Sequence, residues 1–107
     1  MKDISVIIVN YNVKHLLDNC INSIFKSSKG LDTEVIIYDN NSFDGSADYI
    51  ESKYIQNPSL SSCVNLIRSD KNLGFARANN IASKQASGKY YPFVTIIFLI
   101  NFLKREF

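Results

Sequence analysis

The sequence predicts an α/β fold with three layers and a mainly parallel sheet. Short apolar runs recur along the chain, at 4–9, 34–38 and 63–67. Each run is followed by a polar turn and then by a segment whose apolar residues repeat every three or four positions. Strands that alternate with helices in this way favour a parallel sheet with right-handed crossovers and helices on its faces.

The composition is that of one globular domain. The chain has 107 residues, of which 46% are hydrophobic, and this is enough to bury one core. The formal net charge is +2 and charges of one sign do not cluster, so neither nucleic acid nor membrane lipid is indicated as a partner. Cys20 and Cys63 lie outside any CxxC or Cys/His cluster, which favours two reduced thiols. The start lacks the pattern of an export signal, so we expect a cytoplasmic protein, with the inner face of the membrane as the alternative.

The first unit is a strand followed by a helix. Residues 4–9 form a nearly unbroken β-branched run, which suits a strand covered on both faces. Asn12 is the expected N-cap of the helix, and Gly30 is its expected stop. Between them, apolar residues recur at the spacing of a helix that packs on the sheet: Val13, Leu16, Leu17, Cys20, Ile21, Ile24 and Phe25.

The second unit repeats this order. Residues 34–38 form a short strand, and a polar turn over 39–45 leads into the next helix. Asp44 and Ser46 are both competent N-caps for that helix. Its apolar face is expected to comprise Ala47, Ile50 and Tyr54.

The third unit has a strand over 63–67 that ends at Arg68, and a helix is expected from about Gly74 to Ala86. Ligands of parallel α/β sheets bind beyond the carboxyl ends of the strands. The segments in which a binding site is expected are therefore 10–12, 39–44 and 68–77.

Asp39 is the first candidate for chemistry, because it closes the second strand. An acidic residue at this position can accept hydrogen bonds from the ring N–H or the ribose hydroxyls of a nucleoside. Considered alone, Asp39 is more often explained as a turn or cap residue.

The segment 72–80 is the second candidate, and it lies at the start of the third helix. Gly74 permits close approach of a backbone, Arg77 suits a phosphate, and the N–H groups of a helix start favour anions. When this segment is considered alone, the commoner explanation is an ordinary junction between a loop and a helix, with Arg77 exposed to solvent.

Three segments in this order closely resemble the family 2 glycosyltransferases, which have the Rossmann-like GT-A fold. The segments are SVIIVNYN at 5–12, VIIYD followed by NSFDGS at 35–46, and NLGFARANN at 72–80, and the resemblance covers residues 3 to about 91. It implies that Val9, Tyr11, Asp39 and Arg68 line a nucleoside pocket and that 72–80 closes over the base and the sugar. The donor-binding residues implied in this way are Val9, Tyr11, Asp39, Asn41, Arg68, Asn72, Gly74, Arg77 and Asn80.

The resemblance also implies an activity for complete relatives. They transfer a sugar from a nucleotide donor, most often a UDP-sugar, to an acceptor hydroxyl, as in the biosynthesis of cell-surface polysaccharides. A carboxylate pair in an Asp-x-Asp motif holds Mg²⁺ or Mn²⁺ on the diphosphate of the donor in such relatives.

The chain departs from that pattern after residue 91. The stretch expected to carry the carboxylates is PFVTII at 92–97, and there is no acidic residue between Asp70 and Glu106. The prediction is a nucleotide-binding half over 1–91 and an apolar tail over 92–107, with no metal, cofactor or catalytic residue in this chain. We interpret it as a truncated or frameshifted, inactive domain, incomplete at its C-terminus. For the tail, the alternative is a strand that keeps its place in the sheet but has diverged and lost its carboxylates. For the chain as a whole, the alternative is a noncatalytic nucleotide-binding or interaction module.

The apolar run over 90–103 is shorter than the roughly twenty residues that cross a bilayer as a helix. It therefore fits a buried fourth strand better than a membrane span.

Overall fold

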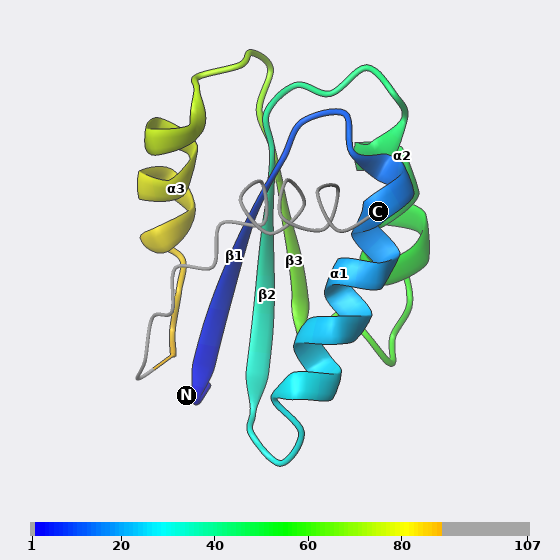
Figure 1. The fold of residues 1–107 in the computed structure, drawn as a ribbon, viewed down its shortest axis with the longest axis vertical. Helices are drawn as coiled ribbons and strands as arrows, with labels where there is room; N and C mark the ends of the chain where they lie inside the picture. Colours follow the sequence, from blue (N-terminus) through cyan, green and yellow to red (C-terminus); the bar gives the residue numbers. More distant parts are fainter. Residues whose placement is uncertain (1, 89–107) are drawn as a thin grey trace, which may run out of the picture.

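The computed structural model describes residues 2–88, which form a parallel sheet between two layers of helices (Figure 1). Helix α3 covers one face of the sheet, and α1 and α2 cover the other. In chain order the elements are β1 (Ile4–Asn10), α1 (Lys14–Ser27), β2 (Thr33–Asp39), α2 (Ser46–Ile50), the π-helical turn η1 (Glu51–Ile55), β3 (Val64–Arg68) and α3 (Phe75–Ser83). The predicted three-layer α/β fold is confirmed.

The strands lie in the order β1-β2-β3, and both pairs are parallel. The register pairs Asn10 with Asp39 and Asp39 with Arg68, so the last residues of the three strands form one row. All three loops that follow these strands lie at the same edge of the sheet, which is the upper edge in Figure 1. We call it the carboxyl edge.

The larger core lies between the sheet and α1, α2 and η1. Its strand residues belong to the alternate positions that point to this face, and its helix residues come from the stripe predicted for α1. Ten Ile, Leu and Val side chains of the two cores are almost fully buried. Close packing leaves each of these branched side chains few rotamers. The buried members of this core are Ile8, Leu17, Cys20, Ile21, Val35, Ile37, Ile50, Tyr54 and Val64.

The smaller core lies between the sheet and α3. Ala78 and Ala82 are both 0% exposed, one helical turn apart. Such small side chains let the helix approach β1 and β2 closely. They pack there against Ile7, Val9, Ile36 and Tyr38.

The starts of two helices differ from the prediction. Helix α1 begins at Lys14 with Val13 at the N-cap position, so the prediction of Asn12 as N-cap is wrong. Asn12 has a left-handed backbone, with a φ of 56°, and its side chain bonds to a different loop. Helix α2 begins at Ser46 with Gly45 at the N-cap position, so neither Asp44 nor Ser46 is its N-cap.

Three helix ends also differ. The second helix passes after Ile50 into a π-helical turn over Glu51–Ile55, which the spacing of apolar residues does not reveal. Helix α3 ends at Ser83, before the predicted end at Ala86. Helix α1 ends at Ser27, ahead of the predicted stop at Gly30.

Cys20 and Cys63 are free thiols, and burial raises the pKa of Cys20. Within residues 2–88, none of the helices combines the length and the apolar character needed to cross a membrane. The predicted fourth strand and the stretch at 92–97 lie outside the described residues.

Candidate functional site

Asn10 ties the first two loops of the carboxyl edge together. Its side chain is 0% exposed, and its Nδ2 lies 2.7 Å from Asp39 Oδ1, 2.7 Å from Ser46 Oγ and 3.2 Å from Ser42 Oγ. Asp39 Oδ2 in turn accepts a hydrogen bond from the backbone N–H of Ser42 at 3.1 Å. The Asp39 carboxylate is thus held by one bond on each oxygen.

The same two loops are joined again through Asn12. The Asn12 N–H donates to Ser42 Oγ at 3.0 Å, and Asn12 Oδ1 accepts from the Phe43 N–H at 2.8 Å. Asn12 and Asn41 both have a left-handed backbone, which asparagine tolerates better than most residues. This geometry fixes the direction of both loops.

The third loop is joined to the second. Asn40 is 3% exposed, and its Oδ1 accepts from the Leu73 N–H at 2.9 Å. The Ser69 N–H donates to the backbone carbonyl of Asp39 at 3.0 Å. All three loops of the carboxyl edge are therefore linked by hydrogen bonds before any ligand binds.

Sequence reasoning did not single out these linking residues. Asn10, Asn40 and Ser42 lie in the segments 10–12 and 39–44 in which a binding site was expected, but they were not named among the donor-binding residues. The signal that could have found them is the run of hydrogen-bonding residues at 39–42, directly after a buried strand.

The Asp39 residue is 3% exposed. Each carboxylate oxygen offers about two acceptor sites, and each has one hydrogen bond within the described residues. Each oxygen therefore keeps one acceptor site that these bonds do not use.

Tyr11 and Phe43 meet at the outer side of the first two loops. Their ring centroids are 6.1 Å apart, and the ring planes are at 82° in an edge-to-face arrangement. Tyr11 is 39% exposed and Phe43 is 82% exposed. Tyr11 was named among the donor-binding residues, whereas Phe43 was only part of the segment 39–44 in which a site was expected.

Arg68, another predicted site residue, ends β3 and points to the side of α2. Its Nη2 lies 2.9 Å from Asp48 Oδ1. The side chains of Arg68 and Asp48 are 51% and 81% exposed. An exposed pair of this kind is weak, so Arg68 can leave it for an anionic ligand at little cost.

The Val9 side chain lies on the opposite face of the sheet from those of Asp39 and Arg68. Strand alternation places it on the α3 face, where it is 0% exposed and packs in the smaller core. Asp39 and Arg68 occupy the positions that face α1 and α2. The side chains of these three residues are therefore not brought into one pocket.

The predicted residues of the third loop and α3 are exposed. Asn72 Oδ1 accepts from the Gly74 N–H at 2.8 Å, and this turn leads into α3. Gly74 has a φ of 80°, and a Cβ there would meet no atom within 4 Å, so the space beside it is open. Arg77 and Asn80, like Asn41 in the second loop, are exposed to solvent.

Asp44 bonds to the first residues of two helices. Its Oδ2 accepts from the Lys14 N–H of α1, and its Oδ1 accepts from the Ser46 N–H of α2, both at 3.0 Å. Burial raises the pKa of Asp44, but hydrogen bonds from Ser46 and Lys14 outweigh that effect and lower the pKa below its usual value. The ionised carboxylate also suits the positive ends of both helix dipoles.

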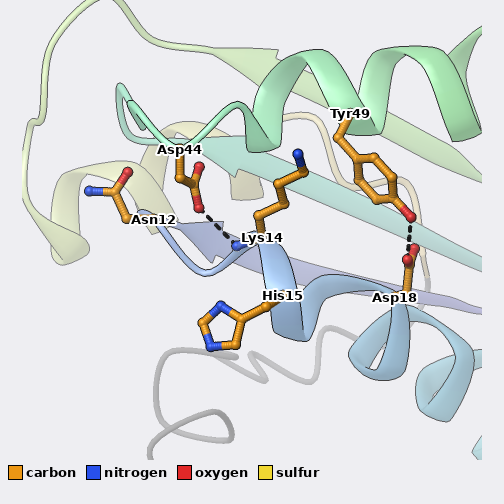
Figure 2. Close-up of a pocket in the computed structure, with 6 residues that line it drawn as sticks. All are labelled: Asn12, Lys14, His15, Asp18, Asp44 and Tyr49. Atoms are coloured by element: carbon orange, nitrogen blue, oxygen red, sulfur yellow. Dashed lines mark hydrogen bonds between the residues drawn. The ribbon is translucent and has the colours of Figure 1, made fainter.

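An open pocket of about 520 Å³ lies beside the start of α1 (Figure 2). The side chain of Lys14 extends between Asp44 and Tyr49, whereas His15 points away from them. The residues that line the pocket are Asn12, Lys14, His15, Asp18, Asp44 and Tyr49. Asp18 is already paired with Lys53, and none of the residues named as donor-binding from the sequence is among them. We therefore place the candidate site at the carboxyl edge.

Asp18, which lines this pocket, links α1 to the second helix. It accepts hydrogen bonds from the hydroxyls of Tyr49 and Tyr54, the latter at 2.6 Å, and Lys53 Nζ lies 2.9 Å from its Oδ1. Burial raises the pKa of Asp18, but these three partners together lower it below its usual value. Burial and the neighbouring Asp18 raise the pKa of Tyr54.

No group of three or more His, Cys, Asp or Glu side chains within residues 2–88 is placed to hold a metal ion. The predicted departure from the metal-binding pattern concerns 92–97, beyond the described part of the chain. It stays a prediction.

The sequence model of the family described as Glycosyl transferase family 2 matches residues 5–99. The match runs past the domain boundary predicted at residue 91, and that boundary stays a prediction. No curated protein matches the chain.

Among solved structures, the chain is similar to the mannosyltransferase PcManGT from Pyrobaculum calidifontis, whose structure is a complex with GDP-Man and Mn²⁺. The TM-score is 0.69 at 23% sequence identity, and the match covers 85% of this chain and 28% of that one. The similarity shows a common fold. This chain corresponds to less than a third of the length of that transferase.

Proposed function

Because the chain belongs to glycosyl transferase family 2, we propose that the carboxyl edge of its sheet binds the nucleotide of a sugar donor. The observation that carries the proposal is the network around Asp39. The carboxylate of Asp39 lies at the end of β2, and each of its oxygens has one acceptor site that the internal bonds do not use. The three loops of the carboxyl edge are hydrogen-bonded to Asp39 or to the neighbouring Asn40. A binding group held in this way loses little conformational freedom when a ligand arrives.

We assign the roles from position and chemistry. Asp39 accepts a hydrogen bond from the N–H of the base or from a ribose hydroxyl, and Tyr11 contacts the base. Arg68 exchanges its exposed partner Asp48 for an anionic group of the ligand. Arg77, exposed on the first turn of α3, is a second candidate for a phosphate oxygen.

The proposed ligand is a nucleoside diphosphate sugar. The fold is shared with a transferase solved with GDP-Man and Mn²⁺, which supports this class of donor. Within it, we propose a UDP-sugar. In complete domains of this kind, the bond between the sugar and the diphosphate breaks, and an acceptor hydroxyl forms the new bond to the sugar. Because the described residues offer no metal site, the proposal for them is restricted to nucleotide binding.

The test is a calorimetric titration of the full chain with UDP, GDP and inorganic diphosphate. Asp39→Asn keeps the shape of the side chain but replaces one acceptor oxygen by a donor. We expect it to weaken UDP binding by about tenfold or more, because a buried donor of the ligand loses its partner. The matched control is Asp32→Asn, which alters an exposed carboxylate paired with Lys2 before β2, at the opposite end of the sheet.

Equal affinity of the two variants for UDP would contradict the assignment of Asp39. A stronger response to GDP than to UDP would contradict the proposed base while leaving nucleotide binding in place. Thermal unfolding of both variants, measured without ligand, separates a loss of binding from a loss of folded protein.

A further inference from the structure

We propose that Phe43 is a nucleobase-contacting residue and forms, with Tyr11, a two-ring corner for the base of the donor. The inference rests on the proposed nucleotide binding and extends it to a residue that was not named among the donor-binding residues. Phe43 is the most exposed large hydrophobic side chain of the described residues, at 82%. An aromatic ring in this position gains little from the fold itself.

Phe43 is nevertheless held in place. Its N–H donates to Asn12 Oδ1 at 2.8 Å, and the preceding Ser42 Oγ accepts from the Asn12 N–H at 3.0 Å. Both bonds are made by Asn12, the residue after Tyr11, and they join the loop of Phe43 to the loop of Tyr11. The exposed ring is therefore carried on backbone whose position is set by the carboxyl edge.

The geometry of the pair suits a planar ligand. The two rings are at 82° to each other, with centroids 6.1 Å apart. A flat base that stacks on the Tyr11 ring within such a corner presents its edge to Phe43. Stacking on one ring and edge contact with the other are both favourable arrangements of aromatic groups.

The polar groups nearby complete the recognition of a nucleoside. Asn10 and Ser42 hold Asp39, and Ser42 is also the residue that precedes Phe43. Ser42 thus bonds both to the Asp39 carboxylate and to the loop that carries Tyr11.

The experiment compares Phe43→Ala and Phe43→Tyr in the full chain, by calorimetric titration with UDP and with inorganic diphosphate. We expect Phe43→Ala to weaken UDP binding by about tenfold, on the scale of aromatic contacts to bases, and to leave diphosphate binding unchanged. Phe43→Tyr keeps the ring and should retain UDP affinity. The control is Leu31→Ala, which removes another exposed hydrophobic side chain, 51% exposed, before β2 at the other end of the sheet.

A double-mutant cycle with Tyr11→Ala tests the corner itself. If the rings act together on the base, the losses of UDP affinity are not additive. The inference is overturned if Phe43→Ala binds UDP like the unsubstituted chain, or if UDP and diphosphate binding fall equally. A Phe43→Ala chain that differs only in self-association overturns it as well, since the ring then serves a contact between copies. If the unsubstituted chain binds no nucleotide, the proposed function fails first, and this result is distinct from a failure of Phe43 alone.

Discussion

Asp44 shows how one side chain can replace two local caps. The N-cap positions of α1 and α2 are Val13 and Gly45, and neither side chain supplies a capping oxygen. The two oxygens of Asp44 accept the N–H groups of Lys14 and Ser46 instead. A carboxylate in this position joins the starts of two helices that are separated in the sequence by a whole strand.

We expect Asp44→Ala to lower the free energy of unfolding by about 2 kcal/mol, because two helix starts each lose a partner worth roughly 1 kcal/mol. The matched control is Asp48→Ala, four residues further on, whose side chain is 81% exposed and paired only with Arg68. That change should cost less than about 1 kcal/mol. Denaturant unfolding followed by circular dichroism measures both, and equal losses would show that Asp44 acts only as a surface charge.

A change of helical register brings two tyrosines of the second helix to the same side. In a π-helical turn, residues five apart lie nearly on the same side, whereas in an α-helix they diverge. Tyr49 and Tyr54 are five apart, and η1 follows directly after Ile50. Both hydroxyls reach the carboxylate of Asp18 on α1, and Lys53 pairs with it as well.

This contact predicts a dependence on pH. The pKa of Asp18 is lower in the folded chain than its ordinary value of 3.8, so its stabilising contribution is complete above about pH 4. It is lost as the pH falls below 4, through the lowered pKa. We expect Asp18→Asn to be less stable than the unsubstituted chain at pH 7 and to lose less stability on acidification from pH 5 to pH 3.

Urea unfolding at each pH gives the free energy of unfolding, and its change between pH 5 and pH 3 is compared for the two chains. Asp32→Asn is again the control, because its carboxylate is exposed and bonds to Lys2 at the surface. Parallel pH dependence of the Asp18→Asn variant and the unsubstituted chain would contradict the role given to Asp18.

At the edge of the sheet opposite the candidate site, the last described residues bond to the beginnings of β1 and β2. Glu34 is 5% exposed and accepts hydrogen bonds from Ser5 Oγ, from the Ser87 N–H and from Ser87 Oγ. The Gly88 N–H donates to Ser5 Oγ at 2.8 Å. The segment that follows α3 is thereby anchored to the first residues of β1 and β2.

Gly88 allows this closure because a Cβ there would lie 2.7 Å from Ser5 N and 2.9 Å from the carbonyl carbon of Ile4. Both contacts are to backbone, which cannot turn aside as a side chain does. We expect Gly88→Ala to lower the free energy of unfolding by about 1 to 3 kcal/mol, the range typical of overpacking.

Ser87→Ala is the matched comparison for Gly88→Ala, since it removes one hydrogen bond to Glu34 without a clash and should cost about 1 kcal/mol. Hydrogen exchange of the Ser87 and Gly88 amides shows whether the segment has left the sheet. Unchanged exchange and stability in Gly88→Ala would mean that the close approach is absent in solution.

The order of strands and helices could be predicted from the sequence, because apolar spacing directly reports which side of an element is buried. The stripe of α1 and the β-branched run of β1 both identify the faces that form the core. The positions of Asp39 and Arg68 at strand ends also followed from the sequence, since the register of a parallel sheet aligns the ends of its strands. The spacing of apolar residues within one strand or helix was enough to predict these features.

Only the tertiary structure decided how the loops are connected. Asp44 and Lys14 are 30 positions apart, and Ser5 and Gly88 are 83 apart, so no local pattern relates them. The same holds for Val9, whose neighbour Asn10 enters the polar network while Val9 itself is buried under α3. Hydrogen bonds between distant loops depend on strand register and helix packing, and these exist only once the whole core has formed.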